Sequence, residues 1–184
     1  QKIIGRPKEY LKSKRNFTLI LMCFGKAQFN KGTTIGGKEL KNLKEGILKS
    51  MPEFSQIEKD YFAKNAKIAK LKVDNHLFVY TFNGKPLFFQ VPGNQVCPNL
   101  ILVLEYPDLL PCVYVDEGAV RALLRGADLM APGIKQCPQE FEEGQVIAIR
   151  LLDQEEAFAI GVSVVSSEDI KRNPKNTAIE IKHI

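Results

Sequence analysis

Apolar residues in the first half of the chain recur at helical spacing before they begin to alternate. From Gly36 to Met51, leucine and isoleucine return every three or four positions, while lysines occupy positions between them. This spacing predicts an amphipathic helix, which Pro52 ends because proline cannot continue the backbone hydrogen bonding. A second helical stretch is expected over residues 55–65.

The segment that follows has the composition of β-strands. Strand-like sequence runs over residues 67–80, and aromatic residues alternate in side at its end. Asn83-Gly84 is a residue pair typical of a type I′ hairpin turn. The return strand, 86–91, is apolar enough to be buried on both faces. We therefore predict an N-terminal α/β domain with a mixed or antiparallel sheet.

A proline-bounded connector divides the chain. It covers residues 106–111 and follows the apolar run 100–104. We place the domain boundary in this connector, with an N-terminal α+β domain over 22–108 and a second domain over 109–184. Residues 1–21 form a basic extension of doubtful role.

The second half alternates short strands with one compact helix. A strand around Val113 and Val115 leads into a helix that Asp116 begins and Gly126 ends, as the helix dipole and the left-handed cap favour. Further strands are expected over 145–152 and 157–165, joined by the turn 153–156. Several short strands around one main helix predict a small β-barrel and an α+β fold class overall.

The positive charge of the chain is concentrated at its start. The formal net charge is +5, and residues 1–21 hold six cations against the single acid Glu9. The rest is neutral, but residues 22–105 carry 12 lysines against 7 acids, whereas residues 106–184 carry 8 cations against 13 acids. A basic half could attract RNA phosphates, and an acidic half would depend on local cations and backbone donors. The net charge of the chain therefore does not by itself show whether the protein binds RNA.

Catalytic and metal-binding patterns are missing from the sequence. There is no glycine-rich phosphate loop, nucleophile elbow or paired-histidine motif, and the four cysteines have no C-x-x-C pairing. His76 and His183 are interpreted as structural or solvated. The apolar run 17–24 imitates a secretion signal but is short, and no run reaches the length of a membrane span. We expect a cytoplasmic binding protein with reduced thiols and without catalytic residues, metal or cofactor.

The stretch from Val115 to Ile134 resembles the PUA domain, an RNA-binding fold named after pseudouridine synthases and archaeosine transglycosylases. In that family a helix ending in Gly-Ala-x-x-Met-x-Pro-Gly and Val or Ile leads into a strand, as residues 126–134 do here. A strand before the motif and an Ala-Ile-Gly-Val strand after it, 159–162, supply the context. The resemblance implies an RNA-binding surface around this helix.

The residue types in this motif suit contact with RNA. Small residues such as Gly126, Ala127 and Gly133 would let an RNA backbone approach the main chain. Arg121 and Arg125, one helical turn apart, could clamp phosphates. The alternative is a capped helix with solvent-exposed arginines. The full set of candidate RNA-binding residues is Gly118, Arg121, Arg125, Gly126, Ala127, Asp128, Met130, Pro132, Gly133 and Lys135.

The first half adds a second resemblance. Residues 83–89, 98–100 and 106–111 look like the N-terminal domain of the malignant-T-cell-amplified-sequence family of translation factors, which is related to the N-terminal part of ligatin. Residues 115–120 are similar to the same family. The resemblance covers the chain from about Met22 to His183.

What this family resemblance implies is a role in translation. It indicates a factor that binds the small ribosomal subunit with a density-regulated-protein-like partner and acts in reinitiation, unconventional initiator-tRNA delivery, or removal of tRNA after termination. The PUA domain would touch the tRNA acceptor end, and the N-terminal domain would meet ribosomal RNA and the partner. Lys38, Lys41 and Lys44 are candidate ribosomal RNA contacts, or simply a solvated helix face. The alternative function is a general RNA-binding adaptor for RNA modification or decay.

Overall fold

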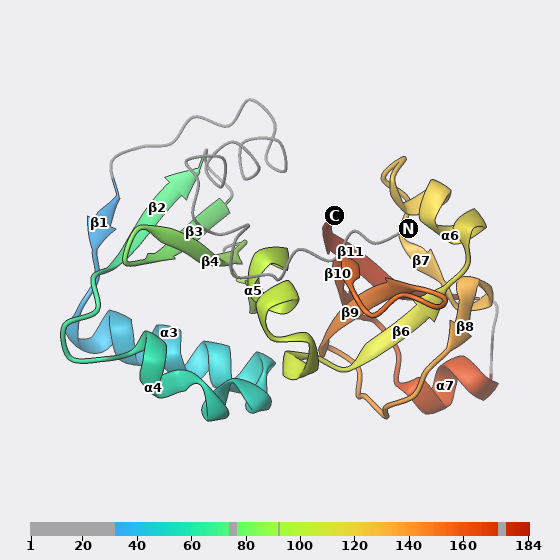
Figure 1. Ribbon diagram of the computed structural model, residues 1–184, viewed down its shortest axis with the longest axis horizontal. Helices are drawn as coiled ribbons and strands as arrows, with labels where there is room; N and C mark the ends of the chain where they lie inside the picture. The colour runs from blue at the N-terminus through green and yellow to red at the C-terminus, as the bar shows by residue number, and fades with distance from the viewer. Residues whose placement is uncertain (1–31, 74–76, 92, 173–175) are drawn as a thin grey trace, which may run out of the picture.

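The computed structural model describes residues 32–73, 77–91, 93–172 and 176–184, which form two β-sheets and the helices packed on them (Figure 1). The extension 1–21, the apolar run 17–24 and His76 lie outside these ranges. Among the described helices, none combines the length and the apolarity that crossing a membrane would need.

The first sheet is antiparallel throughout, with five strands in chain order. They are β1 (Thr33–Thr34), β2 (Ile68–Val73), β3 (Leu77–Phe82), β4 (Lys85–Gln90) and β5 (Val96–Pro98). The predicted hairpin is confirmed, because Asn83 and Gly84 have φ values of 50° and 81°. The single strand-like segment expected over 67–80 is corrected to two strands, β2 and the start of β3.

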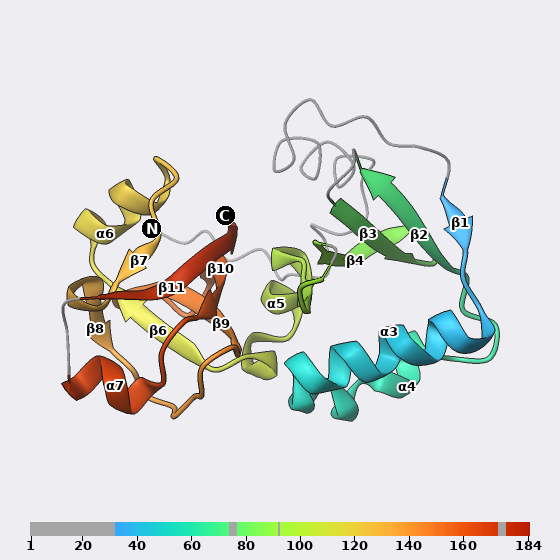
Figure 2. The same ribbon diagram turned by 180° about the vertical axis from the view of Figure 1, so that it is seen from behind.

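Helices cover one face of this sheet, as both views show (Figures 1 and 2). Helix α3 (Gly37–Ser50) confirms the predicted amphipathic helix and buries Leu43 and Ile47. The helical stretch expected over 55–65 is confirmed only in part: the chain forms a 3-10 turn, η1 (Pro52–Gln56), and one short helix, α4 (Glu58–Tyr61), and is not helical after Tyr61.

An aromatic cluster explains this interruption. The ring of Phe54 packs against Tyr61, Phe62 and Phe88, with ring centroids 5.4 to 6.3 Å apart. Short helices gain most of their stability from such packing rather than from local propensity. The cluster therefore sets the path of residues 52–62 over the sheet.

The second sheet curls into a nearly closed barrel, which confirms the predicted fold. Its strand order is β7-β11-β10-β9-β6-β8, antiparallel except where β6 runs parallel to β9. The strands are β6 (Cys112–Val115), β7 (Leu129–Met130), β8 (Ile134–Gln136), β9 (Val146–Leu151), β10 (Ala157–Ser163) and β11 (Thr177–His183). The outermost strands, β7 and β8, are joined by the three-residue turn η3 (Ala131–Gly133), which holds the two edges close together.

Two helices accompany the barrel. Helix α6 (Glu117–Leu123) is the predicted one, whereas α7 (Ser167–Arg172) and strand β11 were not predicted. In both views α6 and α7 lie at different ends of the barrel (Figures 1 and 2).

The connector packs the two sheets against each other. The apolar run 100–104 is a helix, α5 (Leu100–Glu105), capped by Asn99, and a 3-10 turn, η2 (Pro107–Leu109), follows it. One hydrophobic cluster includes residues from both halves, such as Leu102 of α5 and Ile160 of β10. The two sheets therefore share a core, and the boundary at residues 108 and 109 stays a prediction.

Two buried polar side chains cross this junction. Arg150 of β9 is only 8% exposed, and its Nη2 donates to the carbonyl oxygen of Pro107 at 2.7 Å. His183 of β11 is 7% exposed, and its Nδ1 accepts from the amide of Leu100 at 3.4 Å. The first bond joins the connector to the barrel, and the second joins the start of α5 to it.

His183 makes the fold sensitive to acid. Burial lowers its pKa to about 4, compared with about 6.5 in an unfolded chain. Between these values the unfolded state binds more protons, so stability falls as pH drops through this window. We expect the unfolding free energy to lose up to about 3 kcal/mol between pH 6.5 and pH 4 from this group.

Urea titrations at several pH values check this expectation. His183→Gln should remove this part of the pH dependence while leaving the part due to carboxylates. If wild type and variant lose stability in parallel over the whole window, His183 is not the responsible group.

Candidate nucleic-acid interface

The start of helix α6 is capped by the side chain of Asp116. The Asp116 Oδ1 atom accepts from the Ala119 amide at 2.9 Å, and its Oδ2 lies 3.1 Å from the Lys135 Nζ of β8. The Ala119 amide, followed by Lys135, holds the pKa of Asp116 below its usual value. Because the pKa is depressed, the cap is intact above the ordinary pKa of aspartate and weakens only as the pH falls. Asp116 therefore anchors the start of α6 at neutral pH.

The helix ends in a Schellman motif, which confirms the predicted glycine cap. The Gly126 amide donates to the Leu123 carbonyl at 2.8 Å, and the Ala127 amide donates to the Ala122 carbonyl at 3.2 Å. Gly126 has φ of 88°, and a Cβ atom placed on it would meet nothing within 4 Å. The main chain at this glycine is therefore open to an approaching molecule.

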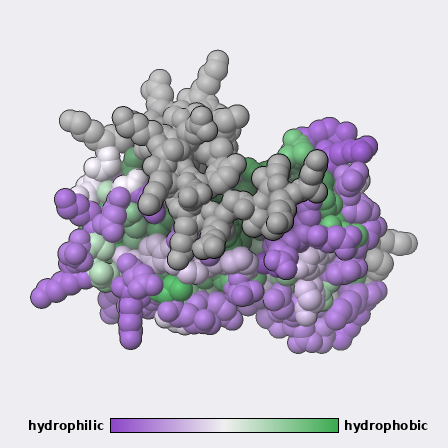
Figure 3. Space-filling view, viewed as in Figure 1, coloured by the Kyte–Doolittle hydropathy of each residue, from purple (hydrophilic) through white to green (hydrophobic). Residues whose placement is uncertain are grey.

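The candidate residues gather around this helix, in what we call the α6 corner, residues 118–135. Nine of the ten are exposed: Gly118, Arg121, Arg125, Gly126, Ala127, Asp128, Met130, Pro132 and Lys135. Gly133 is half-buried. Figure 3 shows hydrophilic and hydrophobic surface meeting at the end of the barrel that carries α6. The structure thus brings the predicted set together on one corner.

The three cations of the α6 corner differ in their surroundings. Arg121 lies 3.6 Å from Glu117 in an exposed pair one helical turn apart, and Lys135 pairs with Asp116. No described acid pairs with Arg125. Exposed pairs contribute little, about 0.3 to 0.5 kcal/mol on a helix, so Arg121 can exchange its partner for a phosphate at small cost. Arg125 is available without any exchange.

Some candidate residues support the corner rather than face outward. Asp128 Oδ1 accepts from the Ile181 amide of β11 at 2.9 Å, which ties the loop after α6 to the barrel. A Cβ atom on Gly133 would lie 3.0 Å from a methyl carbon of Leu129 and 3.5 Å from Ala119. Gly133 therefore leaves room for packing between η3 and α6.

An exposed leucine was missed in the sequence. Leu124 is 64% exposed, and Met130, on the other side of the Gly126 turn in sequence, is 45% exposed. Leu123 beside it is buried, and two adjacent leucines in a short helix cannot both face the core. That adjacency was the sequence feature that could have identified an apolar contact next to Arg125.

The lysines of α3 form a separate surface. Lys44 lies 2.6 Å from Glu58 and 5.9 Å from the centre of the Phe62 ring, and Lys41 lies 3.8 Å from Glu45. No described acid pairs with Lys38. Helix α3 and helix α6 lie at opposite ends of the molecule (Figures 1 and 2), so these lysines do not join the α6 corner.

Side chains that could together hold a metal ion do not gather among the residues that the structure describes. No group of three His, Cys, Asp or Glu side chains within these residues could do so. Cys97 and Cys112 are buried, and burial raises the pKa of the Cys97 thiol to about 12, which keeps it protonated.

Family models match both halves of the chain. The Pre-PUA-like domain matches residues 24–107, and the PUA domain matches residues 111–184. Two solved structures have a similar fold at 23% sequence identity. A hypothetical protein of Pyrococcus horikoshii has a TM-score of 0.70, covering 83% of this chain and 93% of that one, and a PUA domain of Aeropyrum pernix, crystallised with tartrate, has a TM-score of 0.66, covering 85% and 86%.

Curated relatives are similar over most of their length. Translation machinery-associated protein 20 of Schizosaccharomyces pombe is 31% identical over 158 residues, which cover 83% of this chain and 87% of that protein. The malignant T-cell-amplified sequence 1 homolog of Dictyostelium discoideum is 31% identical over 150 residues, which cover 79% and 82%.

Proposed function

The chain belongs to the family of translation machinery-associated protein 20 and the malignant T-cell-amplified sequence proteins, and we propose that it is a non-enzymatic RNA-binding factor of translation. Its relatives are named for association with the translation machinery, and its second half is a PUA domain. It would bind RNA on the small ribosomal subunit, and it would act in the cytoplasm.

The observation that carries this proposal is the open main chain beside unpaired positive charge at the α6 corner. Gly126 offers its backbone without steric hindrance, and Arg125 next to it has no acidic partner among the described residues. Phosphate oxygens accept hydrogen bonds from guanidinium groups. The Gly126 and Ala127 amides already donate to the Leu123 and Ala122 carbonyls, so the glycine allows close approach and Arg125 supplies the hydrogen bonds. The corner can therefore hold a polynucleotide against α6.

The RNA segments and the partner protein that we propose are those that the family resemblance implies. The α6 corner would contact the acceptor end of a tRNA, and Lys38, Lys41 and Lys44 would contact ribosomal RNA. Because these surfaces lie at opposite ends of the molecule, the protein would bridge two RNA segments. A density-regulated-protein-like partner would complete the complex in reinitiation, unconventional initiator-tRNA delivery, and tRNA release with recycling after termination.

Sedimentation with purified small ribosomal subunits tests this function. We expect the wild-type protein to co-migrate with the subunits and the variant Arg121→Ala/Arg125→Ala/Lys135→Ala to remain largely in the free fraction. The matched control Lys85→Ala/Lys171→Ala/Arg172→Ala removes three exposed cations elsewhere and should co-migrate. Wild-type protein that stays in free ribonucleoprotein fractions would contradict the proposal and favour an adaptor for RNA modification or decay.

A further inference from the structure

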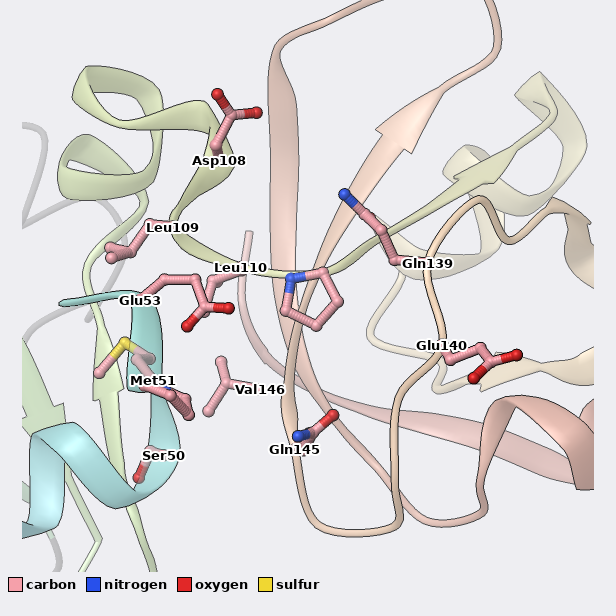
Figure 4. Close-up of a pocket in the computed structure, with 12 residues that line it drawn as sticks. Ser50, Met51, Glu53, Asp108, Leu109, Leu110, Gln139, Glu140, Gln145 and Val146 are labelled. Atoms are coloured by element: carbon pink, nitrogen blue, oxygen red, sulfur yellow. The ribbon is translucent and has the colours of Figure 1, made fainter. Parts of the chain in front are cut away.

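A groove with an acidic rim runs along the junction of the two sheets, on a surface that the proposed RNA contacts do not use. It consists of two adjacent hollows of about 190 and 250 Å³, which share Glu53, Asp108 and Leu109 in their linings. Figure 4 shows the first hollow between the end of α3, the connector and the loop before β9. We call this surface the junction groove.

The junction groove is negatively charged and has no cation of its own. Glu53, Glu105, Asp108 and Glu140 line it, all four are exposed, and its linings contain no lysine or arginine. Elsewhere in the described chain, seven carboxylates form ion pairs, but none of these four does. In Figure 4, Glu53, Asp108 and Glu140 lie on three separate segments around the hollow, with the Glu53 carboxylate pointing into it and those of Asp108 and Glu140 pointing outward from its rim. The field in the groove therefore attracts cations and repels a polyanion such as RNA.

The walls of the groove are partly polar and partly apolar, and its floor is formed by buried apolar side chains. Met51, Leu110 and Val146 line the first hollow, Ile57 and Tyr106 line the second, and Leu109 lines both. Sites for drug-sized molecules usually enclose about 300 to 1,000 Å³, so each hollow suits a single side chain better than a cofactor. An extended peptide directs every second side chain to the same face, which would fit two hollows placed next to each other.

The framework of the groove is fixed. Gln139 Oε1 accepts from the Cys112 amide at 2.9 Å, and Arg150 holds the connector through Pro107. Because Arg150 is buried behind the connector and is not part of either lining, it does not neutralise the rim by direct contact. A partner would meet a preformed surface, which lowers the entropic cost of binding.

We propose that the junction groove binds an extended protein segment in which basic side chains flank apolar ones. The apolar side chains would enter the two hollows, and lysine or arginine would pair with the acidic rim. This proposal is independent of RNA binding at the α6 corner, because it concerns different residues and the opposite charge.

Fluorescence anisotropy with a short labelled peptide that alternates lysine and leucine tests the proposal on the full chain. The variant Glu53→Gln/Asp108→Asn/Glu140→Gln removes rim charge at nearly constant shape. We expect its affinity for the peptide to fall about tenfold, because three exposed ion pairs are lost and each contributes roughly a twofold gain in affinity. The control Glu143→Gln/Glu155→Gln/Glu156→Gln changes the net charge equally and should bind like wild type.

Two further probes make the test selective. A peptide that alternates lysine and serine should bind more weakly than the lysine-leucine peptide, because it leaves the hollows empty. The rim variant should bind an RNA oligonucleotide at least as tightly as wild type. The proposal is overturned if the wild-type protein does not bind the lysine-leucine peptide, or if it binds both peptides equally. It is also overturned if the control variant loses as much affinity for the peptide as the rim variant, or if the rim variant loses affinity for RNA.

Discussion

Replacing Gly161 with serine should destabilise the protein by about 3 kcal/mol or more, the largest single-residue effect that we expect. A Cβ atom at this position would lie 2.6 Å from the carbonyl oxygen of Glu180 and would also overlap a methyl carbon of Ile179. Overpacking typically costs about 1 to 3 kcal/mol when side chains can move. Here one obstacle is the backbone of β11, so β10 and β11 would have to separate.

Thermal unfolding followed by circular dichroism measures this effect. For a chain of this length, about 3 kcal/mol corresponds to a fall in Tm of roughly 6 to 12 °C. The matched control is Gly36→Ser, since Gly36 has an extended backbone and a Cβ atom added there would meet no other atom within 4 Å. Equal Tm values for the two variants would show that β10 and β11 are not packed as described.

Removing the three cations of the α6 corner should weaken RNA binding by on the order of 10²-fold at low salt. Arg121, Arg125 and Lys135 would each give up a phosphate contact, and each contact to single-stranded RNA contributes about 0.7 to the slope of log affinity against log salt. The triple alanine variant should therefore lose about 2 units of that slope. Anisotropy titrations over a salt series measure both quantities.

Single substitutions should rank by how free each cation is. Arg125→Ala should cost the most affinity, because Arg125 has no acidic partner among the described residues. Lys135→Ala should cost the least, because the Lys135 charge is already neutralised by its ion pair with Asp116. An unchanged salt slope in the triple variant would mean that these cations do not contact phosphate.

Elements with strong local chemistry were predictable from the sequence. Helix α3 follows from its apolar period, the β3–β4 hairpin from Asn83-Gly84, and helix α6 from Asp116 at its start and Gly126 at its end. In each case a few adjacent residues determine the backbone conformation.

Elements that depend on distant contacts were not predictable in this way. Strand β7 has only two residues and exists through its pairing with β11, and the path of residues 52–62 is set by the ring of Phe88 on β4. The run 100–104 was too short for its period to distinguish helix from strand. Tertiary packing decided each of these segments.

The candidate site was predicted in composition more fully than in its interactions. The sequence placed Arg121 and Lys135 on the surface, but the pairing of Lys135 with Asp116 depends on β8 lying beside the start of α6. The pairing of Arg121 with Glu117 follows from the i, i+4 spacing of these two residues in the sequence.

Nuclear magnetic resonance mapping of the isotope-labelled full chain with an RNA minihelix that ends in a single-stranded acceptor tests the central claim most directly. We predict that the largest amide shifts fall at the α6 corner, with Gly126 and Ala127 among them, and that they shrink as salt is added. Shifts that spare these amides and concentrate elsewhere on the barrel would contradict RNA binding at this corner.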